Sequence, residues 1–159
     1  MENLQNKVAL VIGGTSGIGN ATANALLNNG ATVHIVGRNI DKVADAPNLV
    51  KHTANISNAA EVDALTAKIE SLDNLDYLVN ASGIFGPKPF LDHTMEDYNS
   101  YLDLNRGFFF ITQSAAKKMK ATKGGSIVNV GSMWAKQAVK ATPSSAYSCL
   151  LYTSPSPRD

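Results

Sequence analysis

The chain has 159 residues, of which 44% are hydrophobic and 17% are charged, and its formal net charge is +1. This composition predicts a globular domain rather than a disordered chain, and the near-neutral charge argues against the basic surface that nucleic acids and anionic membranes require. No apolar run approaches the roughly 18 residues that span a bilayer, and no apolar segment precedes the first expected strand. We therefore expect a cytoplasmic protein without nucleic-acid or membrane partners. Its one cysteine, Cys149, leaves no intrachain disulfide.

Short apolar runs alternate with longer amphipathic stretches along the chain, a pattern typical of βαβ units and a parallel sheet. The expected strands are Lys7–Ile12, Thr32–Val36, Leu49–Thr53, Asp76–Asn80 and Ser126–Val130. The expected helices are Ile18–Asn29, Asn58–Leu72 and Met95–Ala121, the last with an apolar face through Tyr98, Leu102, Phe109 and Ala116. The predicted fold class is α/β, a Rossmann-type doubly wound parallel sheet that binds ligands at the carboxyl ends of its strands.

The segment Gly13–Gly19 (GGTSGIG) lies directly between the first strand and the first helix. Gly13 permits a tight turn, Gly17 lets the backbone approach a diphosphate, and Gly19 lets helix and strand pack closely. The amides of the helix N-terminus would then face the phosphates. An ordinary strand-to-helix turn is the alternative interpretation, but the flanking strand and helix favour a phosphate loop.

The end of the second strand indicates which dinucleotide is bound. An NAD enzyme needs a carboxylate there for the ribose 2′-hydroxyl, and that carboxylate repels a 2′-phosphate. Here Gly37 occupies the position and Arg38 follows it. Because an arginine pairs with phosphate through charge-assisted hydrogen bonds, NADP(H) is expected in preference to NAD(H). A solvated turn arginine is the alternative.

The GxxxGxG spacing resembles the TGxxxGxG fingerprint of the short-chain dehydrogenase/reductase family, with Ile12 in place of the threonine. Two further motifs follow in the family's order. Asn55-Ile56 lies where the family has an aspartate and an apolar residue beside the adenine, and Asn80-Ala81-Ser82-Gly83 resembles its NNAG turn. The resemblance implies no metal and the following cofactor-binding residues: Gly13, Thr15, Ser16, Gly17, Ile18, Gly19, Arg38, Asn55, Ile56, Asn80, Ala81, Ser82 and Gly83.

The same resemblance implies the catalytic residues Asn105, Ser132 and Tyr147. In the family the tyrosine is the acid/base, the serine bonds the substrate oxygen, and the asparagine holds a water of the proton relay. The implied reaction is reversible reduction of a ketone or aldehyde to an alcohol with NADPH, on a small-molecule substrate. The full-length parent is expected to be a homo-oligomer.

The family's lysine, four residues after the tyrosine, is replaced here by Leu151. The eleven residues CLLYTSPSPRD are those that a transposase-type sequencing adapter encodes when it is read in frame. We therefore expect residues 1–148 to be an incomplete NAD(P)-binding Rossmann domain lacking its C-terminal strands, and residues 149–159 to be a non-native tail.

The segment TPSSAYS is expected to be a loop, and the segment CLLYTSPSPRD that follows is expected to form no regular helix because of Pro155 and Pro157. The fifth strand would be an exposed edge, and the chain as given would be inactive. Two other functions stay open, a non-catalytic dinucleotide-binding or sensing protein and a methyltransferase that uses S-adenosylmethionine.

Overall fold

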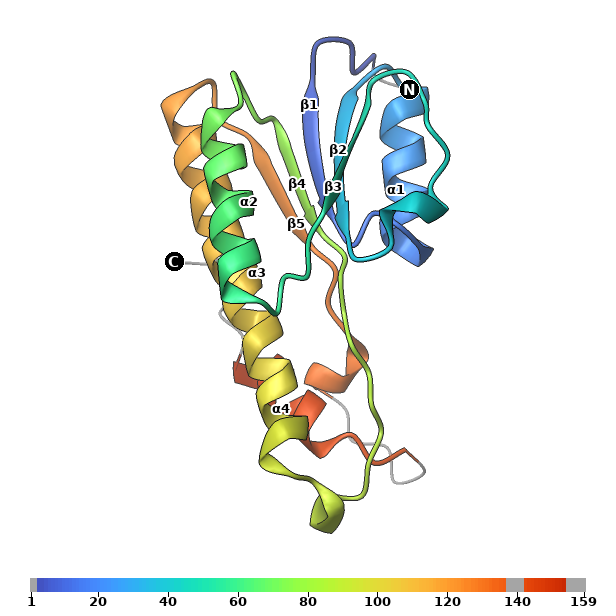
Figure 1. Cartoon of the computed structure of the whole chain (residues 1–159), viewed down its shortest axis with the longest axis vertical. Coiled ribbons are helices and arrows are strands. Elements are labelled where there is room, and N and C mark those ends of the chain that lie inside the picture. Colours follow the sequence, from blue (N-terminus) through green and yellow to red (C-terminus); the bar gives the residue numbers. More distant parts are fainter. Residues whose placement is uncertain (1–2, 137–141, 154–159) are drawn as a thin grey trace.

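The computed structural model describes residues 3–136 and 142–153, which form a parallel sheet with helices on both faces (Figure 1). The strands are β1 (Val8–Ile12), β2 (Thr32–Gly37), β3 (Leu49–Thr53), β4 (Tyr77–Asn80) and β5 (Ser126–Asn129), in the spatial order β3-β2-β1-β4-β5. The predicted α/β class is therefore confirmed, and each strand lies within one residue of its expected bounds. Strand order reverses between β1 and β4, which is where doubly wound sheets bind ligands.

Helix α1 (Gly17–Asn28) covers one face of the sheet, while α2 (Ala59–Ser71) and α3 (Met95–Ala121) cover the other (Figure 1). Side chains of β1 alternate between the two layers: Ala9 and Val11 pack on the α1 side, and Leu10 and Ile12 pack on the α2 and α3 side. All four are almost completely buried, so β1 is the central strand of two hydrophobic cores. No helix among the described residues is long and apolar enough to cross a membrane.

The buried face of α3 differs from the expected one. Residues Tyr101, Leu104, Ile111, Ala115 and Met119 are buried, whereas Leu102 and Phe109 are 39% and 53% exposed. The helix carries two apolar stripes, so periodicity alone does not show which one meets the sheet. Gly107 decides it, because a Cβ there would collide with the carbonyl oxygen of Ile56. Only the stripe that includes Gly107 can pack this closely against the backbone of Ile56.

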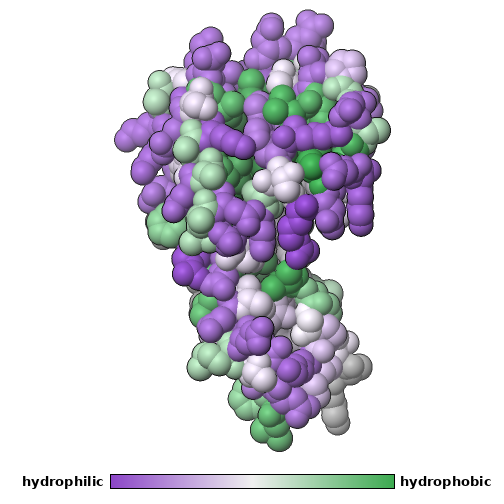
Figure 2. Space-filling view, viewed as in Figure 1, coloured by the Kyte–Doolittle hydropathy of each residue, from purple (hydrophilic) through white to green (hydrophobic). Residues whose placement is uncertain are grey.

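A short helix, α4 (Ser145–Thr153), replaces the loop expected around Tyr147. Its last five residues belong to CLLYTSPSPRD, so the prediction that this segment forms no regular helix was wrong for them: the prolines stop the helix only after Thr153. Residues 154–159 of the expected tail lie outside the described part of the chain. Ala146 and Leu150 are spaced four residues apart and are both buried against Tyr101 of α3. With η3 (Met133–Ala135) and the N-terminal part of α3, this helix forms the narrower lower part of the molecule (Figures 1 and 2).

Strand β5 is the exposed edge that the sequence predicts. Within the described residues it pairs only with β4, and Val128 is 54% exposed. Ile127, which points to the opposite face, packs against the core beneath α3. An open apolar edge offers unpaired backbone groups to a second chain and favours aggregation.

We expect Val128→Lys to raise the soluble yield, because a lysine on an edge strand opposes strand addition by charge and costs little at an exposed position. The matched control is Ile127→Lys, which places the same charge against the core and should lower the yield. Yield and light scattering of the two variants and the parent measure this. A Val128→Lys yield equal to or below that of the parent would contradict it.

Two histidines lie side by side at the other edge of the sheet. His34 on β2 and His52 on β3 have Nδ1 and Nε2 2.9 Å apart, with ring planes within 13° of each other. Burial lowers the pKa of His34. Burial first, then the neighbouring charges of His34 and Lys68, lower the pKa of His52 to about 4. The folded state therefore keeps this pair neutral in mildly acidic solution.

The free energy of unfolding should consequently fall as the pH drops from 6.5 towards about 4. In this interval His52 binds a proton in the unfolded chain but not in the folded protein. Urea unfolding midpoints across this interval measure the effect, which lies largely above the range where ordinary carboxylates titrate. His52→Gln should flatten the profile, and Lys68→Gln should flatten it less. An unchanged profile in His52→Gln would refute this origin.

Candidate functional site

A groove of about 270 Å³ opens at the carboxyl ends of β1, β2 and β4. All of the predicted cofactor-binding residues line it except Gly19 and Asn80: Gly13, Thr15, Ser16, Gly17, Ile18, Arg38, Asn55, Ile56, Ala81, Ser82 and Gly83. These residues come from four separate stretches of the chain. The parallel sheet brings them together because the carboxyl ends of its strands share one edge.

The first turn of the groove is held by backbone bonds to β2. The amides of Gly13 and Gly14 donate to the carbonyl oxygen of Val36 at 2.9 and 3.2 Å. Gly13 has φ of +82°, and a Cβ on it would lie 2.7 Å from the Ser82 nitrogen. Ile12, at the position of the family's threonine, is fully buried in the core. The backbone bonds therefore tie the loop to the sheet without a hydroxyl at that position.

Helix α1 begins at the mouth of this groove. Gly17 has φ of +53°, and nothing lies within 4 Å of the position of a Cβ there. The side chain of Ser16, the N-cap, makes no capping bond, so it leaves the first amides of the helix to other acceptors. A diphosphate fits this arrangement, since it needs free amides and a close approach to the backbone. Gly19 lies behind the loop, where a Cβ would collide with the Gly13 carbonyl oxygen.

The far end of the groove is formed by β2 and β3. A Cβ on Gly37 would lie 2.5 Å from the Thr15 side chain, so threonine occupies the space that a carboxylate would need. Arg38 is exposed and forms no ion pair with any described residue. Asn55 accepts a hydrogen bond from the Ser57 amide at 3.1 Å, which fixes its side chain at the end of β3. Ile56 is almost fully buried and forms part of the groove floor.

Asn80 lies behind the groove, where it links three elements. Its Nδ2 donates to Thr112 Oγ1 of α3 at 2.9 Å and to Asn129 Oδ1 of β5 at 2.7 Å. The side chain is almost fully buried. This amide therefore holds β4, β5 and α3 together, and the following residues, Ala81–Gly83, are the ones that reach the groove wall.

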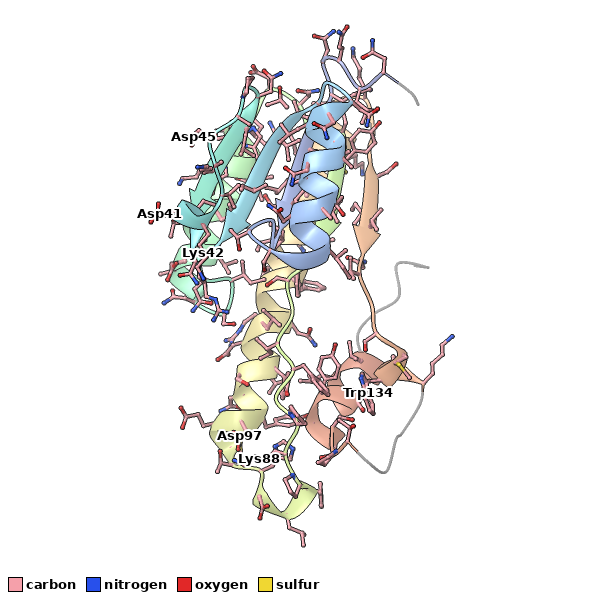
Figure 3. All side chains as sticks on the ribbon, turned by 90° about the vertical axis from the view of Figure 1, so that its right-hand side faces the viewer. Asp41, Lys42, Asp45, Lys88, Asp97 and Trp134 are labelled. Carbon is pink, nitrogen blue, oxygen red and sulfur yellow. The ribbon has the colours of Figure 1, made fainter. Side chains whose placement is uncertain are left out.

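The three predicted catalytic residues lie on three different elements, η3, α4 and α3. Ser132 is the N-cap of η3, and its Oγ accepts from the Trp134 amide at 3.4 Å. Tyr147 lies on α4, which packs against both η3 and α3. Asn105 is a half-buried residue of α3, next to the groove-lining Leu104. Figure 3 shows Trp134 in the lower part of the molecule, at the short helices below β5.

The segment that follows Gly83 forms a second cavity that the sequence did not predict, of about 310 Å³. Its lining residues are Ile84, Phe85, Gly86, His93, Asp97, Ser100 and Tyr101. The Tyr101 hydroxyl accepts from the Gly86 amide at 3.0 Å and so fixes the loop to α3.

At the base of this segment Asp97 pairs with Lys88 and caps α3 with Thr94 (Figure 3). The Lys88 hydrogen bond, with those from Thr94, lowers the pKa of the Asp97 carboxyl. The TxxD capping pattern was the one sequence signal for this region.

Comparison with known proteins gives a consistent family. The model described as short chain dehydrogenase matches residues 7–149. An uncharacterized oxidoreductase of Staphylococcus haemolyticus is 33% identical over 148 residues, which cover 88% of this chain and 64% of that protein. A 3alpha-hydroxysteroid dehydrogenase of Mediterraneibacter gnavus is 34% identical over 142 residues, which cover 82% of this chain and 57% of that protein. The chain thus spans less than two thirds of these relatives.

Solved structures agree with the sequence relatives. A short chain dehydrogenase/reductase family protein superimposes with a TM-score of 0.85 at 31% identity, over 95% of this chain and 65% of that one. A short-chain type dehydrogenase/reductase from Mycobacterium marinum gives 0.84 at 25% identity, over 94% of this chain and 65% of that one. With a family model covering nearly the whole chain and relatives above 30% identity, this chain belongs to the short-chain dehydrogenase/reductase family of oxidoreductases.

Proposed function

We propose that the groove binds NADP(H), and that the parent enzyme transfers hydride between NADP(H) and a carbonyl or alcohol substrate. The observation that carries the dinucleotide part is the open backbone at Gly17, at the N-terminus of α1. Its amides supply the donors that a diphosphate accepts. The family membership supports nicotinamide chemistry in the same place.

The choice of NADP(H) over NAD(H) rests on the end of β2. Arg38 is exposed at the groove rim, and no described residue neutralises it. Its guanidinium can take a 2′-phosphate through two parallel charge-assisted bonds. Gly37 offers no carboxylate to the ribose hydroxyl, and Thr15 fills the space beside it. Asn55 and Ile56 would border the adenine, at the end of β3.

The proposed proton chemistry uses the residues below the groove. When bound, the nicotinamide gives or takes the hydride. Ser132 would donate a hydrogen bond to the substrate oxygen, because its Oγ already accepts from the Trp134 amide and its proton is available. Tyr147 would give its phenolic proton to the developing alkoxide, or take it back in the reverse direction. Asn105 would hold the water that returns the proton from solvent.

The chain as given lacks one group that this chemistry needs. Leu151 follows Tyr147 by one turn of α4, which is where the family's lysine would stand. A leucine can neither stabilise a tyrosinate nor bond the ribose. We propose that residues 149–159 are a non-native tail that replaces the natural sequence, and that this chain is inactive for that reason. Sequencing the source gene beyond the codon for Ser148 tests the tail directly, and a lysine at the third codon after it is the expected result.

The oxidoreductase relatives support the enzyme over the non-catalytic sensor and over the methyltransferase. Retained hydroxyls at Ser132 and Tyr147 agree with this choice, because neither alternative uses them. The cytoplasmic location and the homo-oligomeric parent stay predictions.

Replacing Arg38 should change cofactor preference. Arg38→Gln is expected to weaken NADPH binding about tenfold or more, since a hydrogen bond to a charged group contributes about 1.5–3 kcal/mol. NADH binding should change little. Lys42→Gln removes a nearby exposed cation outside the groove and is the matched control. Nucleotide fluorescence titrations measure the affinity of each variant for NADPH and for NADH. Equal losses for NADPH and NADH, or equal effects of the two substitutions, would contradict the assignment.

The unmodified chain should bind NADPH without oxidising it in the presence of ketones or aldehydes. Absorbance of the reduced nicotinamide over time measures oxidation, and nucleotide fluorescence measures binding in the same sample. A full-length short-chain dehydrogenase assayed in parallel controls for the substrates. Turnover above the rate without protein would overturn the proposal that Leu151 abolishes activity.

A further inference from the structure

The two proposed catalytic hydroxyls are connected through a pair of aromatic rings. Ser132 is bonded to the Trp134 amide. The Trp134 indole stacks on the Phe85 ring, with centroids 5.8 Å apart and planes 24° apart. The Phe85 ring also contacts the Tyr147 ring edge-to-face, with ring centroids 5.2 Å apart. The contacts therefore run from Ser132 through Trp134 and Phe85 to Tyr147.

Three segments that are distant in sequence supply these rings. Phe85 follows the groove-lining residues Ser82–Ile84, Trp134 belongs to η3, and Tyr147 belongs to α4. Tyr101 of α3 supports the group from behind, with its ring 5.8 Å from that of Tyr147 and its hydroxyl bonded to Gly86. The loop is thus anchored to α3 at Gly86, the residue that follows Phe85.

The rings keep a large apolar surface open. Phe85 is 47% exposed, while Trp134 and Tyr147 are partly exposed. An exposed phenylalanine next to an indole, both held by neighbouring contacts, is a surface that gains free energy when an apolar group covers it. A substrate whose oxygen is bonded by Ser132 or Tyr147 would carry its substituents next to these rings, because Ser132 is bonded to the Trp134 amide and the Tyr147 ring contacts Phe85.

We propose that Phe85 and Trp134 form an aromatic wall that selects carbonyl compounds and alcohols bearing a flat aromatic ring next to the reacting carbon. The wall favours a planar π-face over a puckered ring of equal size, because offset stacking adds to simple area burial. This substrate class rests on the proposed function of Ser132 and Tyr147. The wall's affinity for aromatic rings can nevertheless be measured without turnover.

Trp134 is the only tryptophan in the chain and reports on the wall directly. The test is a tryptophan-fluorescence titration of the full chain with 1-phenylethanol and with 1-cyclohexylethanol, with and without NADP⁺. These secondary alcohols match in size and differ in planarity. The phenyl compound is expected to bind about three- to tenfold more tightly, the range that an aromatic contact contributes. Equal affinities in the unmodified chain would overturn the proposal.

Substitutions at Phe85 test whether the preference for the phenyl compound comes from the aromatic wall or from binding elsewhere on the protein. Phe85→Leu should remove the preference for the phenyl compound, and Phe85→Tyr should restore it. Phe110→Leu alters an equally exposed phenylalanine on α3 and should leave the preference unchanged. A preference that survives in Phe85→Leu would also overturn the proposal. Phenyl selectivity together with no NADPH binding would support the wall and contradict the proposed function, so the two failures are distinguishable.

Discussion

The close contact between the Gly13 carbonyl and Gly19 governs the rest of this structure. Helix α1 can lie against the end of β1 only because Gly19 carries no side chain, and the helix N-terminus is therefore held at the groove. Gly17, two residues before Gly19, faces open space. A methyl group at Gly19 would push α1 away from the sheet and would move its amides away from the site of the proposed diphosphate. Packing and ligand binding thus depend on one backbone approach.

A second constraint, at Asn80, transmits this geometry to the lower part of the molecule. Its amide joins β4 to β5 and to α3. Each of these elements leads to a segment that carries or supports a group proposed to contact the substrate. Beyond β4 comes the loop with Phe85, beyond β5 comes Ser132, and the N-terminal part of α3 supports Tyr147. The dinucleotide groove and the aromatic wall are therefore parts of one arrangement, fixed by a single buried side chain at their junction.

The sequence predicted the parts of the fold that depend on local pattern. Strand bounds and helix bounds follow from apolar periodicity. The groove residues were predictable because the glycine spacing and the strand ends are local signals. The buried face of α3 was not, because the choice between two apolar stripes depends on the contact between Gly107 and Ile56, which are far apart in the chain. Helix α4 was missed, and its buried residues Ala146 and Leu150 pack on Tyr101, a contact between distant parts of the chain that local sequence pattern does not show.

Phe85 shows why substrate selection is harder to predict from sequence than cofactor binding. A cofactor groove reuses backbone amides and glycines, whose positions a short motif specifies. A substrate wall is made of side chains from segments without regular periodicity, and Phe85 stands in a loop that gives no sequence signal beyond its apolar character. Only the fold places it between Trp134 and Tyr147. Relatives that keep the groove and change this one ring would therefore bind the same dinucleotide and differ in the substituents that they accept.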